Sequence, residues 1–223
     1  MEGDFLQTML LTGKLAVWTT SLLLIIGFPL AYLLAYKRFF LKSLLEALIN
    51  MPMVLPPTVL GFYMLVAYSP ENAFGGFLEQ YFDVRLAFSF GGVLLASIIF
   101  SLPFMVQPLQ NGLTSIPESL REASATLGKS PFTTFFRVLV PNMIPSIITA
   151  VAMTFAHCIC EFCVVIMVGG NMPGETRVAS IAIYDEVQAM NYGTANKYSL
   201  VLFLISLILL TIIYSMNSPK KRF

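Results

Sequence analysis

The chain is organised around the segment Ser115-Ile-Pro-Glu-Ser-Leu-Arg-Glu-Ala-Ser-Ala-Thr-Leu-Gly-Lys-Ser-Pro-Phe-Thr-Thr-Phe-Phe-Arg-Val-Leu-Val-Pro141. This segment is charged, and it separates two long apolar segments, 88–113 and 145–169. A charged segment between two apolar ones is expected where a chain leaves a membrane and enters it again. The apolar segments therefore have to be judged first as membrane spans.

Five segments are apolar and long enough to cross a bilayer, which takes about 20 helical residues. They are residues 15–36, 47–68, 88–113, 145–169 and 198–214. The whole chain has 57% hydrophobic and only 11% charged residues, whereas soluble domains carry about 25% charged residues. Since strands with open edges are excluded from lipid, the prediction is an all-α membrane protein with five transmembrane helices. Residues 1–14 are expected to form an external tail.

The distribution of Lys and Arg predicts the orientation. Nine of the 13 lie in one alternating set of segments and four in the other, and the richer set is expected on the cytoplasmic side. The nine are Lys37, Arg38, Lys42, Arg121, Lys129, Arg137, Lys220, Lys221 and Arg222. The N-terminus is then outside, and residues 215–223 are a cytoplasmic basic tail. The net charge of +1 gives no indication of nucleic-acid binding.

Within the quoted segment we expect a short helix. Ser115 is a candidate cap, with Glu118 three residues on. Leu120, Ala123 and Leu127 follow at helical spacing, and Gly128 is suited to end the helix. An amphipathic helix of this kind has three open interpretations: it lies in the lipid interface, packs on the chain's own helices, or docks into a groove on a partner.

The same segment resembles the EAA loop of type I ABC importer permeases, in which E-A-A is followed by Gly and then by I-x-L-P. Glu122-Ala123-Ser124 stands for E-A-A, with Ser for the second Ala, and Gly128 and Pro141 fall at the required spacing, with Val in place of the Ile and Leu. The resemblance implies a MetI-like permease core, in which residues 115–141 carry a coupling helix that docks on an ATPase subunit. The residues implied to couple are Glu122, Ala123, Ser124, Leu127, Gly128 and Pro141.

Two further segments are similar to the molybdate subfamily. Met51-Pro-Met-Val-Leu-Pro-Pro-Thr-Val-Leu-Gly-Phe-Tyr63 resembles its proline-rich second span, and Asn171-Met-Pro-Gly-Glu-Thr-Arg177 resembles its external loop. The loop residues concerned are Pro173, Gly174, Glu175, Thr176 and Arg177. Sulfate and thiosulfate permeases share much of this pattern, so sulfate, thiosulfate or tungstate is the alternative substrate. The prolines predict a broken helix, either in the wall of the path or as a packing kink.

Polar residues within the apolar segments are candidates for a path or for structural roles. No span carries Lys or Arg near its middle, so an oxyanion path would have to use hydroxyls and helix ends. The path candidates are Pro56, Pro57, Thr58, Ser101 and Thr154. Glu161 is interpreted as a structural group that is bonded to a neighbouring helix or lies near the external end. His157, four residues before it on one helical face, is its candidate partner. Cys158, Cys160 and Cys163 lie nearby, but one helix seldom surrounds a metal, so no metal site is predicted.

The resemblance also implies how the chain works. It implies a homodimer in the bacterial inner membrane, two ATP-binding subunits on the cytoplasmic side and a periplasmic oxyanion-binding protein. Gly128-Lys129-Ser130 resembles the end of a phosphate-binding loop, but the earlier Gly and the preceding strand are missing. We therefore expect no cofactor on this chain, no catalytic residues, and ATP and Mg²⁺ bound by the partner. The rivals are a membrane-embedded enzyme and a scaffold or receptor that does not transport.

Overall fold

A computed structural model describes residues 2–217, and the regular elements in this range are all helical. The first helix, α1 (Glu2–Tyr36), is 35 residues long and about 50 Å in length. The predicted external tail, residues 1–14, is therefore not a separate segment, because residues 2–14 form the first turns of α1. Thr8 and Thr12 are buried there, and Thr12 Oγ1 accepts a hydrogen bond from the Ala179 backbone N–H at 2.8 Å.

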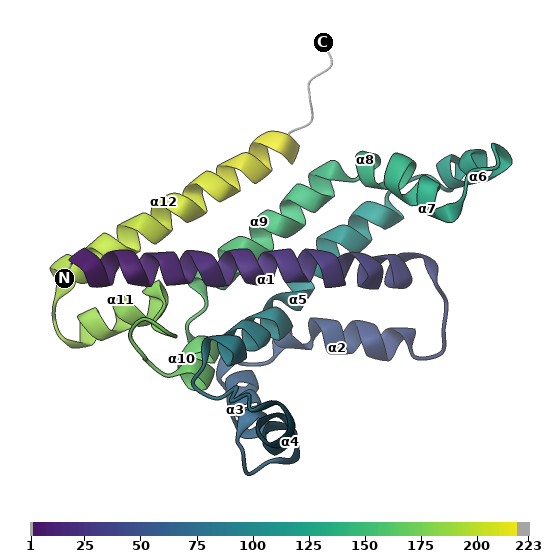
Figure 1. The fold of residues 1–223 in the computed structure, drawn as a ribbon. Helices are drawn as coiled ribbons and strands as arrows, with labels where there is room; N and C mark the ends of the chain where they lie inside the picture. The colour runs from purple at the N-terminus through teal and green to yellow at the C-terminus, as the bar shows by residue number, and fades with distance from the viewer. Residues whose placement is uncertain (1, 218–223) are drawn as a thin grey trace.

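The second apolar segment is a broken helix. The chain bends by 111° between the helices α2 (Lys42–Val54) and α3 (Pro57–Tyr68). Pro56 and Pro57 occupy the break, because proline cannot donate to the preceding turn and its ring restricts the residue before it. A short helix, α4 (Ala73–Phe82), follows α3 and projects from the rest of the bundle (Figure 1).

The central helix of the bundle is α5 (Phe90–Thr114). Ser89 starts it, with its Oγ accepting from the Gly92 backbone N–H at 3.1 Å. It packs against α1, α2, α9 and α10. Where α5 approaches α9, a Cβ on Gly112 would come within 2.6 Å of Ser146 Cβ, so these two helices can pack closely only because position 112 has no side chain.

The fourth apolar segment is also broken, which corrects the prediction of one span over 145–169. The helix α9 (Ile144–Cys160) ends before Glu161, and α10 (Cys163–Gly169) starts after it. Glu161 is extended (φ −70°, ψ 127°), and its Oε1 accepts from the Val164 backbone N–H at 2.8 Å. The carboxylate thus caps α10. Neither proline nor glycine marks this break in the sequence.

The last two helices complete the bundle. They are α11 (Ala179–Gln188) and α12 (Tyr192–Asn217), so the fifth apolar segment extends beyond the predicted range of 198–214. Residues 218–223, which make up most of the predicted basic tail, lie outside the described residues. Within residues 2–217, three helices are long and apolar enough to span a membrane, and the number of candidate spans rises to five when each of two bent helix pairs counts as one span.

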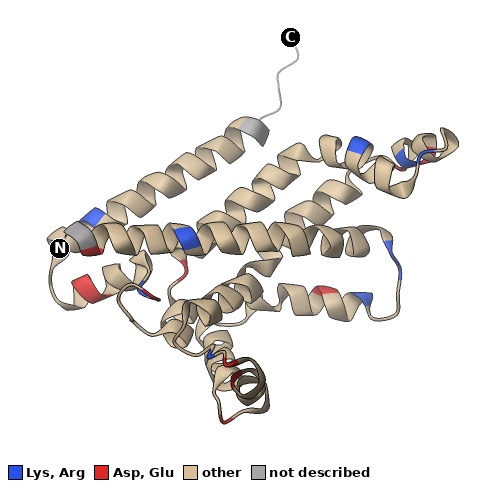
Figure 2. Ribbon diagram, viewed as in Figure 1, with Lys and Arg blue, Asp and Glu red and all other residues tan. Residues whose placement is uncertain are grey.

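Between α5 and α9 the chain forms a projecting arm. It consists of α6 (Glu118–Thr126), α7 (Pro131–Thr134), a five-residue π-helix η1 (Phe135–Leu139) and α8 (Val140–Asn142). The arm lies at one end of the bundle, beyond the ends of α5 and α9 (Figure 1). Figure 2 shows Lys and Arg in this arm and in the loop after α1, while the long helices are mostly uncharged.

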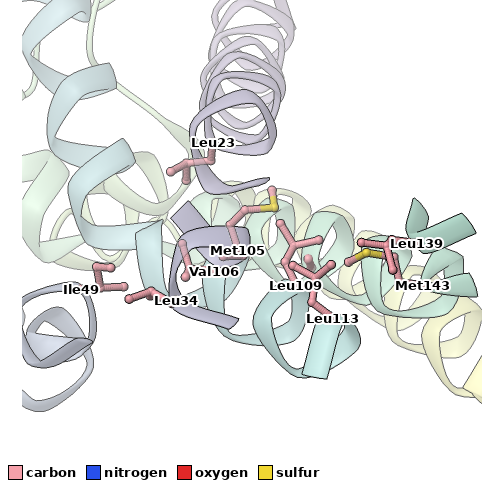
Figure 3. Packing of buried hydrophobic residues seen from close by; sticks show 11 residues of the cluster. Leu23, Leu34, Ile49, Met105, Val106, Leu109, Leu113, Leu139 and Met143 are labelled. Atoms are coloured by element: carbon pink, nitrogen blue, oxygen red, sulfur yellow. The ribbon is translucent and has the colours of Figure 1, made fainter. Parts of the chain in front are cut away.

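The main core cluster connects the arm to the bundle. Leu34 of α1, Leu109 and Leu113 of α5, Leu139 of η1 and Met143 all have at most 2% of their surface exposed. Figure 3 shows Leu109, Leu113, Leu139 and Met143 close together. Burial of a large apolar side chain contributes about 1.5–3 kcal/mol. The base of the arm is therefore packed into the core, and a displacement of the arm has to move η1, α5 and α1 together.

Candidate coupling surface and membrane path

The coupling helix predicted in residues 115–141 corresponds to α6, but its start differs from the prediction. Ser115 ends α5 instead of capping α6, since its Oγ donates to the Gly112 carbonyl at 2.8 Å. Pro117 is the N-cap residue and Glu118 lies in the first turn, where a negative charge interacts favourably with the helix dipole. The capping role assigned to Ser115 is wrong because α5 continues to Thr114, one residue beyond the predicted span, so that Ser115 is its C-cap.

The end of α6 is a Schellman motif. Gly128 has φ +67°, a conformation that glycine adopts without steric cost. The Gly128 backbone N–H donates to the Ala125 carbonyl at 2.9 Å, and that of Lys129 donates to the Ser124 carbonyl at 3.1 Å. These two bonds satisfy carbonyls that the helix end leaves free. The turn reverses the chain into α7 and leaves the end of α6 exposed.

The apolar stripe of α6 faces away from the chain's own bundle. Leu127 is 74% exposed, Leu120 is 39% exposed and Ala123 is exposed as well. Ser124, on the other face, is only 5% exposed, and its hydroxyl is hydrogen-bonded to the Thr134 hydroxyl at 2.7 Å. The interpretation that the stripe packs on the chain's own helices therefore does not hold. The stripe is free to contact lipid or a partner.

The other residues implied in coupling are also on the arm. Glu122 is exposed at the surface of α6, and Pro141 is exposed in α8. Arg121 stacks over the Tyr36 ring, with its Cζ 4.1 Å from the ring centroid, and this contact ties α6 to the end of α1. Glu122, Ala123, Leu127 and Gly128 thus form one accessible surface, whereas Ser124 holds that surface to the rest of the arm.

The structure separates the five path candidates into two groups. Pro56 and Thr58 are exposed and Pro57 is half-buried, at the break between α2 and α3. Ser101 and Thr154 are 1% and 0% exposed, inside the chain. Because a group that lines a path has to reach water, these two residues are corrected from path-lining to core positions in this conformation.

His157 and Glu161 do not pair with each other. His157 Nδ1 lies 3.1 Å from Ser101 Oγ, and its ring stacks on Phe104 with centroids 4.0 Å apart. Glu161 instead caps α10 through its carboxylate, and its backbone carbonyl accepts from Ser180 Oγ at 2.7 Å. The predicted pairing is wrong because it assumed an unbroken helix. Within residues 2–217, no group of three or more His, Cys, Asp or Glu side chains could hold a metal ion.

A line of hydrogen-bonded polar side chains between α2 and α5, which we call the polar seam, was not predicted from the sequence. Gln107 Nε2 donates to Asn50 Oδ1 at 2.5 Å, and Gln110 Nε2 donates to Glu46 Oε1 at 3.1 Å. Lys42 lies 3.9 Å from the same Glu46 oxygen. The signal that could have revealed the seam is polar spacing, four residues apart in α2 and three apart in α5. The seam adds fixed hydrogen-bonding groups on the side of the bundle where α2 breaks.

The loop 171–177 is tightly anchored. Thr176 is buried, and its Oγ1 donates to the Gly169 carbonyl at 2.7 Å. The Arg177 guanidinium lies 3.7 Å from Asp4, 3.5 Å from Asp185 and 3.9 Å from Glu186. Arg177 thus connects the start of α1 to α11. The remaining residues of the predicted external site, Pro173, Gly174 and Glu175, are exposed, and Gly174 has φ +79°.

These features define a class. A helical bundle with up to five spans, two of them broken, together with an apolar helix exposed on an arm, is the architecture expected of a membrane permease subunit. Three comparisons with known proteins identify the family.

The family model described as "Binding-protein-dependent transport system inner membrane component" matches residues 27–218. The chain belongs to this family. It is 44% identical to the molybdenum transport system permease protein of Azotobacter vinelandii over 211 residues, which cover 94% of this chain and 93% of that protein. It is 33% identical to a probable sulfate transport system permease protein of Nephroselmis olivacea, covering 89% of this chain and 70% of that protein.

Among solved structures, the fold is similar to that of the MetNI methionine ABC transporter in inward-facing conformations, with a TM-score of 0.65, 18% identity and 95% of both chains covered. The predicted MetI-like permease fold and the resemblance to ABC importer permeases are therefore confirmed. The chain is a multi-pass membrane protein and a transport permease subunit, not an enzyme, and ATP hydrolysis belongs to a separate subunit.

Proposed function

We propose that this chain is the permease subunit of an ATP-driven importer of molybdate. The observation that carries the substrate is the 44% identity to a molybdenum permease over nearly the full length of both chains. The sulfate relative is less similar, and this chain spans only 70% of it. Sulfate, thiosulfate and tungstate are the alternatives, since they are oxyanions of related shape and charge.

The assembly we propose has two copies of this chain, two ATP-binding subunits and an external oxyanion-binding protein in a bacterial inner membrane. The N-terminus lies outside and the arm lies in the cytoplasm, which is supported by the excess of Lys and Arg at the arm end. In this orientation α6 meets the ATPase, and loop 171–177 faces the binding protein. No cofactor is bound by this chain; ATP and Mg²⁺ bind to the partner.

In the mechanism we propose, the exposed stripe of α6 seats in the ATPase subunit. Movement of that subunit on ATP binding displaces the arm, and the core packing of Leu139 and Met143 passes the displacement to α5, α9 and α1. The bundle then alternates between two states whose balance is set by nucleotide and by the loaded binding protein.

The path in this mechanism runs along the break in α2–α3. Thr58 at the start of α3 and the amides of the polar seam offer weak hydrogen bonds to an oxyanion, and the start of α3 offers the positive end of a helix dipole. Since no Lys or Arg faces the middle of the spans, binding there is weak, and selection of the oxyanion lies with the external binding protein.

The experiment that tests the proposal is uptake in proteoliposomes that contain the chain with its ATPase and binding protein. We expect ATP-dependent accumulation of molybdate that a tenfold excess of sulfate does not suppress. Uptake of sulfate that added molybdate does not inhibit would show instead that the chain is a sulfate permease subunit. No uptake of either anion, with an ATPase subunit that fails to bind the chain, would support the scaffold or receptor alternative.

A further inference from the structure

A large apolar groove lies on the flank of the bundle, between the second half of α1 and the arm. Its volume is about 800 Å³, and its walls are almost entirely apolar. Ile25, Phe28 and Leu33 of α1 form one side, and Phe132 and Phe136 form the other. We call this the α1 groove. The Phe135 ring lies 5.6 Å from the rings of both Phe28 and Tyr32, so the two sides are joined by a rigid aromatic floor.

The α1 groove opens at one end into a polar chamber. This second cavity has a volume of about 380 Å³ and shares Tyr32, Lys37 and Pro131 with the groove. Its other charged lining residues are Arg121, Lys129, Glu118 and Glu122. Three cations thus face two carboxylates. Among the ion pairs of residues 2–217, neither Lys37 nor Lys129 takes part, and the cations outnumber the carboxylates by one, so this end carries a net positive charge.

The position of the groove determines which ligands can reach it. Its α1 side belongs to a helix long and apolar enough to span the membrane. Its other side belongs to Pro131–Asn142, which passes the same test only together with Ile144–Cys160, from which it is bent by 74°. Ile25 is 70% exposed and Phe132 is 73% exposed, so contact of this apolar surface with water is unfavourable. In a bilayer, acyl chains contact it directly. Lys37 follows the last residue of α1, and lipid headgroups are expected at the end of a membrane-spanning helix.

We propose that the α1 groove and the polar chamber together bind one anionic phospholipid. An acyl chain lies in the groove along α1, and the phosphate lies against Lys37, with Arg121 and Lys129 beyond it. The change from an apolar wall to a cationic end, within two cavities that share residues, matches the chemistry of a phospholipid. An apolar helix of a second copy or of a partner would leave the excess positive charge without a counter-ion, and a free phosphate would leave the groove unfilled.

The site has a structural consequence, because its two walls are the end of α1 and the base of the arm. A bound lipid fills the space between them and stabilises one relative position of α1 and η1. The composition of the leaflet at this end of α1 would then bias the arm, independently of which anion is transported.

The test is native mass spectrometry of the full-length chain released from detergent, titrated with phosphatidylglycerol, phosphatidylcholine or inorganic phosphate. We expect one phosphatidylglycerol to bind preferentially. Ile25→Trp fills the groove and should abolish binding. Lys37→Gln should weaken binding of phosphatidylglycerol about fivefold, as expected for one cation near an anionic headgroup, and should leave phosphatidylcholine unaffected.

Two neighbouring variants are matched controls. Ile26 is 47% exposed and Arg38 is exposed, and neither lines the groove or the chamber, so Ile26→Trp and Arg38→Gln should bind phosphatidylglycerol within twofold of the wild type. If Ile25→Trp is unstable, Leu33→Trp takes its place.

Several results would overturn the proposal. They are equal losses in Ile25→Trp and Ile26→Trp, equal affinity for both lipids, or binding of inorganic phosphate with no lipid. Dimers that cross-link through a cysteine at position 25 and exclude lipid would assign the groove to a second copy of the chain.

Discussion

The sharpest consequence of the exposed α6 stripe concerns Leu127. This side chain is 74% exposed in the free chain, and full burial of a leucine contributes about 1.5–3 kcal/mol. Docking can therefore bury about three quarters of the Leu127 side chain, which corresponds to about 1–2 kcal/mol of binding free energy. Leu127→Ala removes most of this contribution without adding a charge or changing the helix. We expect the ATPase subunit to bind this variant about 5- to 30-fold more weakly than the wild type.

The assay for this prediction is titration of the purified chain in nanodiscs with its ATPase subunit, without nucleotide. The matched control is Leu10→Ala, which makes the same change at a leucine that is 65% exposed in the first third of α1; it should bind as the wild type does. Binding of the Leu127→Ala variant within twofold of the wild type, at an unchanged melting temperature, would show that the stripe is not the docking surface.

Three further predictions concern packing and capping. Ser124→Ala removes the hydrogen bond to Thr134, which contributes about 1 kcal/mol. Amide exchange in α6 should therefore be about fivefold faster while transport is retained. Unchanged exchange would show that Ser124 does not hold α6 to the rest of the arm. Gly112→Ala should destabilise the chain by about 1–3 kcal/mol through overpacking, whereas Gly13→Ala, where a Cβ meets no atom within 4 Å, should be neutral or slightly stabilising in thermal melts. Glu161→Ala should destabilise the chain by about 1 kcal/mol because the cap on α10 is lost, whereas Glu161→Gln should retain most of the stability that the cap provides. An equal loss of stability in both variants would indicate that the charge itself is required.

The sequence was most informative where hydropathy and backbone chemistry agree. Residues 15–36 and 88–113 lack any charge, and the structure has continuous helix over the first segment and over the second from Phe90 onward. The paired prolines at 56 and 57 predicted a break, because proline removes a backbone donor, and α2 and α3 bend there by 111°. Gly128 likewise ends α6 with positive φ. In each case one residue type dictates a local conformation without help from distant parts of the chain.

The features that were missed depend on distant contacts. The break at Glu161 carries no proline or glycine, and it is stabilised by a cap on α10 and by Ser180 of α11. The helical start of α1 was expected to be a tail because it is charged, but Thr12 bonds to α11 across 167 positions of sequence. Neither contact is visible in hydropathy, which describes each segment alone.

The candidate site residues, too, were predicted only as far as their local sequence determines their positions. The spacing of Leu120, Ala123 and Leu127 predicted an apolar stripe, but only the structure shows that the stripe points outward. Ser101 and Thr154 were chosen as hydroxyls within spans, and hydropathy cannot tell a buried hydroxyl from one that faces a path. The side of a helix that meets water is set by its neighbours in the bundle.

The central claim is that α6 transmits ATP hydrolysis to the membrane helices, and the most direct test is the ratio of molybdate taken up to ATP hydrolysed in proteoliposomes with Gly128→Asp. No atom lies within 4 Å of a Cβ placed at position 128, so aspartate meets no clash there, but the φ of +67° strains a non-glycine residue and the added charge is unfavourable at the end of α6; the variant therefore perturbs the end of the docking helix and leaves the packed core unchanged. We predict that ATP hydrolysis continues while uptake falls at least tenfold. A variant that transports molybdate with the wild-type ratio would contradict the account.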